Sequence, residues 1–343
     1  KESLSSDKGF GIQLAVNSTS ILNKIGFNKI NPSTIYHPKK LNIYSIAIDK
    51  ICDLDLTKFN DKINSYTTLQ RATLINFLRD EINTQHLRYG KRIQKISETE
   101  NKILINFDDK TSDLVDYLIA ADGIFSNTRS FFEGDKNKPE LKKAIAIRTI
   151  LNLENNINID KKNINLILGA NAHLVIYPTN NKKDLNLVCI IREKEFDQNR
   201  IRDIIDKKIL SQNSNLKVLF KDDLKTWPLY STKNILPSSN KKVFYLGDAF
   251  HGFLPTMAQG ASQSIESAYE LFNLLKENNE DIHNIYFKER SKRAKIIKKR
   301  SDFNFFVFHI SNPIIKIFRN TILKHLVKNK NFISNYLGKV YKN

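Results

Sequence analysis

Residues 243–275 constrain the fold of this chain more than any other segment. They open with the β-forming run 243–246, which stops at Gly247-Asp248. A loop containing glycine and proline follows, and apolar residues at helical spacing predict a helix that begins at Ala261. The first N–H groups of a helix lack intrahelical acceptors and carry partial positive charge. The segment therefore predicts a cradle for an anionic or electron-rich ligand, with Asp248 placed to accept hydrogen bonds from hydroxyl groups.

Length and composition indicate a globular chain with a large core. The 343 residues, 41% of them hydrophobic, allow two domains or one large domain with an insertion. The two cysteines, Cys52 and Cys189, match no metal or redox spacing and fit a reducing compartment. No apolar run reaches the roughly 18 residues of a membrane span. We therefore expect a cytoplasmic protein without a metal site.

Positive charge is concentrated near the C-terminus. Of the formal charge of +19, residues 288–343 supply 15 Lys or Arg against two acids. This pattern fits either a solvated surface on a Lys-, Asn- and Ile-rich chain, or attraction to anionic lipid. The aromatic and aliphatic run 302–315 beside these charges fits a helix docked on its own domain or a weak membrane contact. No nucleic-acid-binding signature is present, so no nucleic-acid partner is expected.

The middle of the chain predicts an antiparallel sheet. The runs 144–151, 163–168, 172–177 and 185–191 are strand-like and have no helices between them. They precede the strand at 243, which predicts a β-rich unit inserted between the two halves of an α/β unit. From about residue 281 the pattern is helical and basic, with an interruption at Pro313.

Two further motifs are weak when each is considered alone. Asp122-Gly123 follows a predicted strand, where an Asx turn is common. Arg71 begins an amphipathic helix, a position typical of surface arginines. In order and spacing, however, these residues and the segment 243–275 resemble the flavoprotein aromatic hydroxylases, which are single-component FAD-dependent monooxygenases such as the salicylate hydroxylases. The resemblance covers about residues 4–310.

The resemblance implies a fold of the p-hydroxybenzoate hydroxylase type. A discontinuous Rossmann-like FAD-binding domain is expected at 1–34, 66–130 and 236–285, with an antiparallel β-sheet substrate domain at 35–65 and 131–235. Residues 286–343 then form a basic helical region. The dinucleotide fingerprint G-x-G-x-x-G is absent from the chain. We therefore expect the first βαβ unit to be missing, that is, an N-terminally truncated member.

The resemblance also implies an activity and a set of cofactor contacts. Members use NADH or NADPH and O₂ to hydroxylate a small phenolic or aromatic-acid substrate through a flavin hydroperoxide, in a pocket that excludes water. By this likeness Arg71 and Asp122-Gly123 contact FAD, and Gly247-Asp248 holds the ribityl chain. Gly260 and Ala261 present N–H groups to the isoalloxazine, where reduced flavin is negatively charged. A monomer or homodimer is expected.

Candidates for the substrate side lie in the predicted sheet and in the loop. Pro255 would line the substrate face of the flavin, Arg148 could hold a carboxylate, and His173 or Tyr177 could deprotonate a phenol. Each of the last three also fits a structural role, as a strand-edge arginine or as a half-buried histidine and tyrosine.

Other functions stay open on the sequence alone. A catalytically silent flavoprotein remnant fits the missing fingerprint, and a peripheral membrane-binding protein fits the basic tail. A flavin halogenase is disfavoured. Resemblance to that class would require two nearby tryptophans, and Trp227 is the single tryptophan of this chain.

Overall fold

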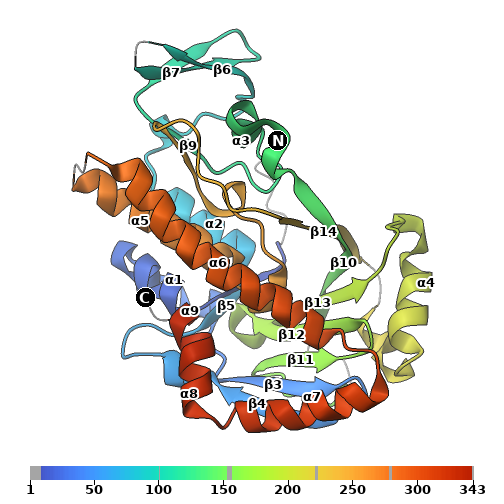
Figure 1. Ribbon diagram of the computed structural model, residues 1–343. Coiled ribbons are helices and arrows are strands. Elements are labelled where there is room, and N and C mark those ends of the chain that lie inside the picture. Colours follow the sequence, from blue (N-terminus) through green and yellow to red (C-terminus); the bar gives the residue numbers. More distant parts are fainter. Residues whose placement is uncertain (1–8, 100, 153–156, 221–222, 278–279, 342–343) are drawn as a thin grey trace. The chain divides into compact units, whose positions relative to one another are not determined.

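The computed structural model describes residues 9–99, 101–152, 157–220, 223–277 and 280–341 (Figure 1). These residues form two compact units. The loop unit comprises residues 78–140 and 230–301, and the sheet unit comprises residues 9–77, 141–229 and 302–341. Among the described residues, no helix combines the length and the apolar character that a membrane crossing requires.

A seven-stranded sheet forms the centre of the sheet unit. The strand order is β14 (Lys225–Thr232), β10 (Pro139–Asn152), β13 (Asp184–Arg192), β12 (Ala172–Thr179), β11 (Ile164–Leu168), β3 (Lys40–Ser45) and β4 (Lys50–Asp55). The pairs β10/β13, β13/β12, β12/β11 and β3/β4 are antiparallel, and β11/β3 is parallel. The predicted antiparallel sheet is thus confirmed.

Alternation along the central strands explains why this sheet buries a core. Leu185, Leu187, Cys189 and Ile191 of β13 are fully buried in one apolar cluster, because every second side chain of a strand points to the same face. The short helix α4 (Ile201–Ile205) adds its isoleucines to this cluster, and a single π-helical turn, Asp206–Leu210, continues it. The helical segment that follows β13 is therefore irregular.

The N-terminal segment belongs to the sheet unit. It forms a small sheet of β1 (Gly11–Leu14), β5 (Thr67–Gln70) and β2 (Ile35–Tyr36), followed by α1 (Val16–Leu22) after β1 and α2 (Arg71–Asp80) after β5. The Thr68 hydroxyl donates to the Pro178 carbonyl of β12 at 2.6 Å. The Gly11 N–H donates to Oδ1 of Asn186 on β13, also at 2.6 Å. These bonds explain why the compact units divide the chain elsewhere than the predicted domains 1–34 and 66–130.

Helices make up most of the C-terminal region, as predicted. They are α6 (Ile282–Phe308), α7 (Pro313–Leu326), α8 (Lys330–Ile333) and α9 (Lys339–Tyr341). The interruption falls at Pro313, where Asn312 caps α7 by accepting from the N–H groups of Ile314 and Ile315. Tyr341 packs edge-on against Phe59 in the sheet unit.

The loop unit contains residues 243–275, the predicted strand, loop and helix. Its strands β9 (Leu118–Ala120) and β15 (Val243–Tyr245) pair in parallel, and β6 (Ile93–Thr99), β7 (Lys102–Phe107) and β8 (Ser112–Val115) form an antiparallel sheet. The helices are α3 (Asn127–Glu133), α5 (Gly260–Lys276) and the first part of α6. Phe244, Phe250, Tyr286 and Phe287 pack together in its core.

Candidate functional site

The two glycine motifs lie at neighbouring strand ends. Because β9 and β15 are parallel and in register, the segments that follow the two strands begin at the same edge of the strand pair. The Leu246 N–H continues the pairing by donating to the Ala120 carbonyl at 2.9 Å. Asp122-Gly123 and Gly247-Asp248 follow directly after these residues. Ligands of α/β proteins bind beyond the carboxyl ends of such strands.

Asp122 organises the first of these loops. Its carboxylate accepts the Ser126 hydroxyl at 2.5 Å and the Thr128 N–H at 3.0 Å, and Ser126 in turn caps α3. Gly123 adopts a left-handed backbone with φ +85°. An added Cβ on Gly123 would meet no atom within 4 Å, so the loop presents bare backbone to open space.

Arg129 ties the two loops together. Its buried guanidinium donates to the Ile124 carbonyl at 2.8 Å and to the Ala249 carbonyl at 2.6 Å. Burial lowers the pKa of Arg129, and the nearby Asp122 opposes that shift. The bond to Ala249 joins residues 120 positions apart, so no local pattern in the sequence indicates it.

Gly247 permits close packing between β15 and α5. Its backbone has φ +54°, and an added Cβ would lie 2.4 Å from Oγ of Ser264. Any larger residue would therefore displace α5 from the strand end, in addition to straining the left-handed turn. This observation explains physically why a glycine stands at this point of the motif.

Asp248 is accessible to solvent and also closely surrounded by protein. Its side chain is exposed, yet desolvation raises the pKa of its carboxyl above the ordinary value. Hydroxyl donors would relieve this cost, because they would replace the water that the protein partly excludes. The carboxylate is thus suited to accept hydrogen bonds from a polyhydroxyl ligand.

The N-terminus of α5 has no side-chain cap of its own. Gln259 stands at the N-cap position, but its side chain makes no capping hydrogen bond. An added Cβ on Gly260 would meet nothing within 4 Å. The helix begins one residue before the predicted Ala261. Pro255 is exposed in the preceding turn, which is fixed where the Thr256 hydroxyl donates to the Ser301 carbonyl of α6 at 2.7 Å. The first turn of α5 therefore has open space beside Gly260, and the partial positive charge of the helix N-terminus is available to an anionic ligand there.

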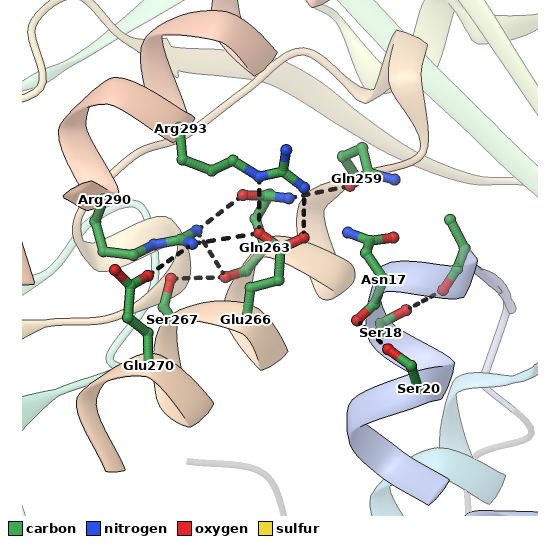
Figure 2. Close-up of polar contacts among 11 residues, drawn as sticks. Asn17, Ser18, Ser20, Gln259, Gln263, Glu266, Ser267, Glu270, Arg290 and Arg293 are labelled. Carbon is green, nitrogen blue, oxygen red and sulfur yellow. Dashed lines mark hydrogen bonds and ion pairs between the residues drawn. The ribbon is translucent and has the colours of Figure 1, made fainter. Parts of the chain in front are cut away.

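A buried charge network holds α5 against α6 (Figure 2). The Glu266 carboxylate accepts from Arg293 at 2.7 and 2.9 Å and from Arg290 at 3.2 Å. Arg290 also contacts Glu270 at 3.2 Å and donates to Oε1 of Gln263 at 2.8 Å. Glu266 and Arg290 are both at most 4% exposed. The arginines give no sequence signal that distinguishes them from the other basic residues of the tail.

The residues predicted to hold or deprotonate the substrate, Arg148, His173 and Tyr177, belong to the sheet unit. The Arg148 guanidinium donates to the Gly11 carbonyl at 2.7 Å and lies 5.0 Å from the centre of the Phe10 ring. Tyr177 is buried beside it, and burial raises the pKa of Tyr177 to about 12, against the opposing effect of Arg148. Arg71 is exposed at the first position of α2. The structure thus brings Arg148 and Tyr177 together.

His173 faces another histidine. Its Nδ1 lies 2.8 Å from Nε2 of His309, and both rings are 1% exposed. Burial, with His309 as the second cause, lowers the pKa of His173 well below its ordinary value. This placement favours a structural role for His173, which sequence reasoning left open beside the catalytic one.

His251 is also buried. It stacks on Phe253 at 4.4 Å, and burial followed by the charge of Arg290 lowers the pKa of His251 to about 3. This position favours a structural role for His251 in the loop. Within the described part of the chain, no group of three metal-ligating side chains occurs.

Comparison with known proteins identifies the family. A family model described as an FAD binding domain matches residues 25–301. The FAD-dependent monooxygenase eupB of a Phoma species is 26% identical over 70% of this chain, and the salicylate hydroxylase of Pseudomonas putida is 24% identical over 64%. In each case the match spans 56% of the relative's length.

Solved structures show the same fold. The structure of Klebsiella pneumoniae HpxO complexed with FAD and uric acid superposes with a TM-score of 0.85. The superposition covers 98% of this chain and 88% of HpxO at 14% identity. The fold is therefore that of the p-hydroxybenzoate hydroxylase type, and the chain belongs to the FAD-binding domain family.

Proposed function

We propose that the protein is an FAD-dependent monooxygenase that hydroxylates a small aromatic substrate. One observation carries the proposal: adjacent parallel strands end in Asp122-Gly123 and Gly247-Asp248, and Arg129 ties the two loops together. The family match and the relatives named as monooxygenases support the same activity.

The residues of the loop unit fit a flavin. Asp248 would accept hydrogen bonds from ribityl hydroxyls, since its carboxylate is exposed but partly desolvated. Gly260 and Ala261 would direct the N-terminal N–H groups of α5 at the electron-rich edge of the ring, because the space beside Gly260 is open. Gly123 offers unhindered backbone to the phosphate and ribose region.

FAD, when bound, would supply the redox chemistry, with NADH or NADPH as the two-electron donor and O₂ as the source of one oxygen atom for the substrate and one for water. The protein's own contribution is electrostatic and steric. The fixed N–H groups at the start of α5 stabilise negative charge without reorganising, which favours the reduced cofactor. We assign Pro255 to the substrate side of the ring and Arg71 to a positive charge near it.

The substrate proposal rests on the sheet unit. A relative is named salicylate hydroxylase, and Arg148 beside Tyr177 could hold the carboxylate of an aromatic acid. For this role Arg148 and Tyr177 are favoured over His173, because Nδ1 of His173 already pairs with Nε2 of His309. We also propose a cytoplasmic location and a monomeric or homodimeric state.

The test combines flavin binding with turnover. Purified protein is titrated with FAD, and NADH or NADPH oxidation is then followed with and without salicylate or 3-hydroxybenzoate, with chromatographic detection of a hydroxylated product. We expect flavin binding and reduction, with reduction accelerated by an aromatic acid. Flavin binding without any reduction by either nicotinamide would contradict the monooxygenase assignment.

A matched pair of variants tests the carboxylate role of Arg148. Arg148→Gln should raise KM for an aromatic acid far more than KM for an uncharged phenol. The control is Arg88→Gln, whose arginine is exposed in the loop unit and paired with Asp113. Equal effects of Arg148→Gln on both substrates would remove Arg148 from the substrate proposal while leaving the flavin assignment intact.

A further inference from the structure

One face of α7 is apolar and exposed. Five large apolar side chains on this helix are each between 51% and 68% exposed: Ile314, Ile315, Ile317, Phe318 and Ile322. Their spacing of i, i+1, i+3, i+4 and i+8 places them on one side of the helix. This set is called the outer face of α7 below. Isolated exposed apolar residues are ordinary, but a contiguous set of this size marks an interaction surface.

The opposite face of α7 already has its partner. Leu323 packs with Phe308 against the apolar cluster of β3, β4 and β11, and Figure 1 shows α7 lying beside β4. Arg319 is buried, and its guanidinium donates to the Val307 carbonyl at 3.3 Å. The helix is therefore anchored on the sheet unit by one side, and the outer face cannot be explained as a core face that has lost its packing.

The aromatic run before α7 behaves differently. Phe305 packs against the cluster around Ile190, and Phe308 packs edge-on against His173. This part of the run 302–315 therefore docks on its own unit, which is one of the two alternatives left open by the sequence. The unpartnered apolar surface lies beyond Pro313, on α7.

Charge indicates the kind of partner. From residue 303 to residue 343 the sequence contains seven Lys or Arg and no acid. Lys324 on α7 and Lys328 after it are exposed, and the helical spacing of Lys324 from Ile317 places Lys324 beside the outer face. Two copies of such a surface would repel each other, so a second copy of this chain is disfavoured as the occupant. An apolar helical face bordered by lysine, in a segment whose own sequence contains no acid, is the pattern of a helix that lies in the interface of an anionic bilayer.

The geometry points to α7 as a docking helix for an anionic lipid surface. The outer face enters the boundary between headgroups and acyl chains, and the lysines remain at the level of the headgroups. The helix lies in the plane of the membrane and does not cross it. The inference is independent of the flavin site, since it rests only on residues of the sheet unit.

The experiment is co-sedimentation of the purified protein with vesicles. Vesicles of phosphatidylcholine alone are compared with vesicles of phosphatidylcholine and phosphatidylglycerol in equal parts, at low and high salt. We expect sedimentation with the anionic vesicles, loss of binding at high salt, and little binding to phosphatidylcholine alone. No binding to anionic vesicles at low salt would overturn the inference.

Matched variants distinguish binding through the outer face from nonspecific adsorption to the vesicles. Ile317→Ser should lower the partition coefficient by about tenfold, because burying one isoleucine is worth roughly that factor. Ile63→Ser is the control, since Ile63 is also 68% exposed in the sheet unit but lies outside α7. Lys324→Gln should weaken binding about fivefold at low salt, whereas Lys62→Gln should not.

Two further results would also overturn the inference. The first is equal weakening by Ile317→Ser and Ile63→Ser. The second is a dimer, detected by analytical ultracentrifugation, that dissociates in Ile317→Ser while vesicle binding is absent, because a second copy would then occupy the outer face. Ile314→Ser provides a second variant on the same face if Ile317→Ser does not fold, and circular dichroism establishes folding in each case.

Discussion

Arg129→Met should destabilise the protein strongly. The change removes two hydrogen bonds from a buried guanidinium, to the carbonyls of Ile124 and Ala249. Hydrogen bonds to a charged group contribute roughly 1.5–3 kcal/mol each. Methionine restores part of the apolar packing but neither bond, so we expect a loss of about 3 kcal/mol or more, a large share of the roughly 5–15 kcal/mol typical of a domain.

The assay is urea denaturation followed by circular dichroism, with FAD affinity measured in parallel. The control is Arg88→Met, because Arg88 is exposed and its ion pair with Asp113, made through one guanidinium nitrogen, should contribute at most about 1 kcal/mol. FAD affinity should fall with Arg129→Met, since the loops it joins carry both motifs. Equal, small losses of stability in the two variants would refute the reasoning.

Three further predictions concern stability. Gly247→Ala should cost about 1–3 kcal/mol, because its Cβ would lie 2.4 Å from Oγ of Ser264 in a left-handed turn; urea midpoints should show partial rescue by Ser264→Ala. Glu266→Gln should cost about 3–5 kcal/mol in the same assay, because it removes the buried carboxylate that pairs with Arg290 and Arg293 and leaves Arg290 only Glu270; a loss below about 1 kcal/mol would contradict this. Burial lowers the pKa of both His251 and His309 to about 3. Below the unfolded-state histidine pKa of about 6.5, the unfolded chain binds more protons than the folded protein does. The free energy of unfolding therefore has its full value above pH 6.5 and decreases as the pH falls toward 3. At pH 5 the expected decrease is about 2 kcal/mol per histidine. Equal urea midpoints at pH 7 and pH 5 would contradict the assignment.

Local patterns made the central segment predictable. The run 243–246 ends in Gly247 because a positive φ and close contact with α5 are needed there, and both requirements appear in sequence as a glycine after a strand. The antiparallel sheet was equally visible, because every second residue of β13 from Leu185 to Ile191 is apolar and lies in one core cluster. Such features depend on neighbours in sequence, and periodicity reports them directly.

Contacts between distant residues were not predictable. His309 contacts the His173 ring although the two residues are 136 positions apart, and Arg129 donates to the Ala249 carbonyl across 120 positions. Neither pairing leaves a local pattern, because a histidine or arginine has the same neighbours in sequence whatever it meets in the fold. The predicted domain division differs from the compact units for the same reason, since Thr68 bonds to Pro178 through tertiary structure alone.

The most direct test of the account is FAD affinity in a pair of variants on α5. Gly260→Val fills the open space beside the helix N-terminus, while Ala268→Val changes an exposed position on the same helix. Fluorescence titration with FAD should show Kd raised by more than about tenfold for Gly260→Val, equivalent to 1.4 kcal/mol, and unchanged for Ala268→Val. Unchanged FAD affinity in Gly260→Val, with the fold intact by circular dichroism, would contradict the claim that this helix N-terminus faces the flavin.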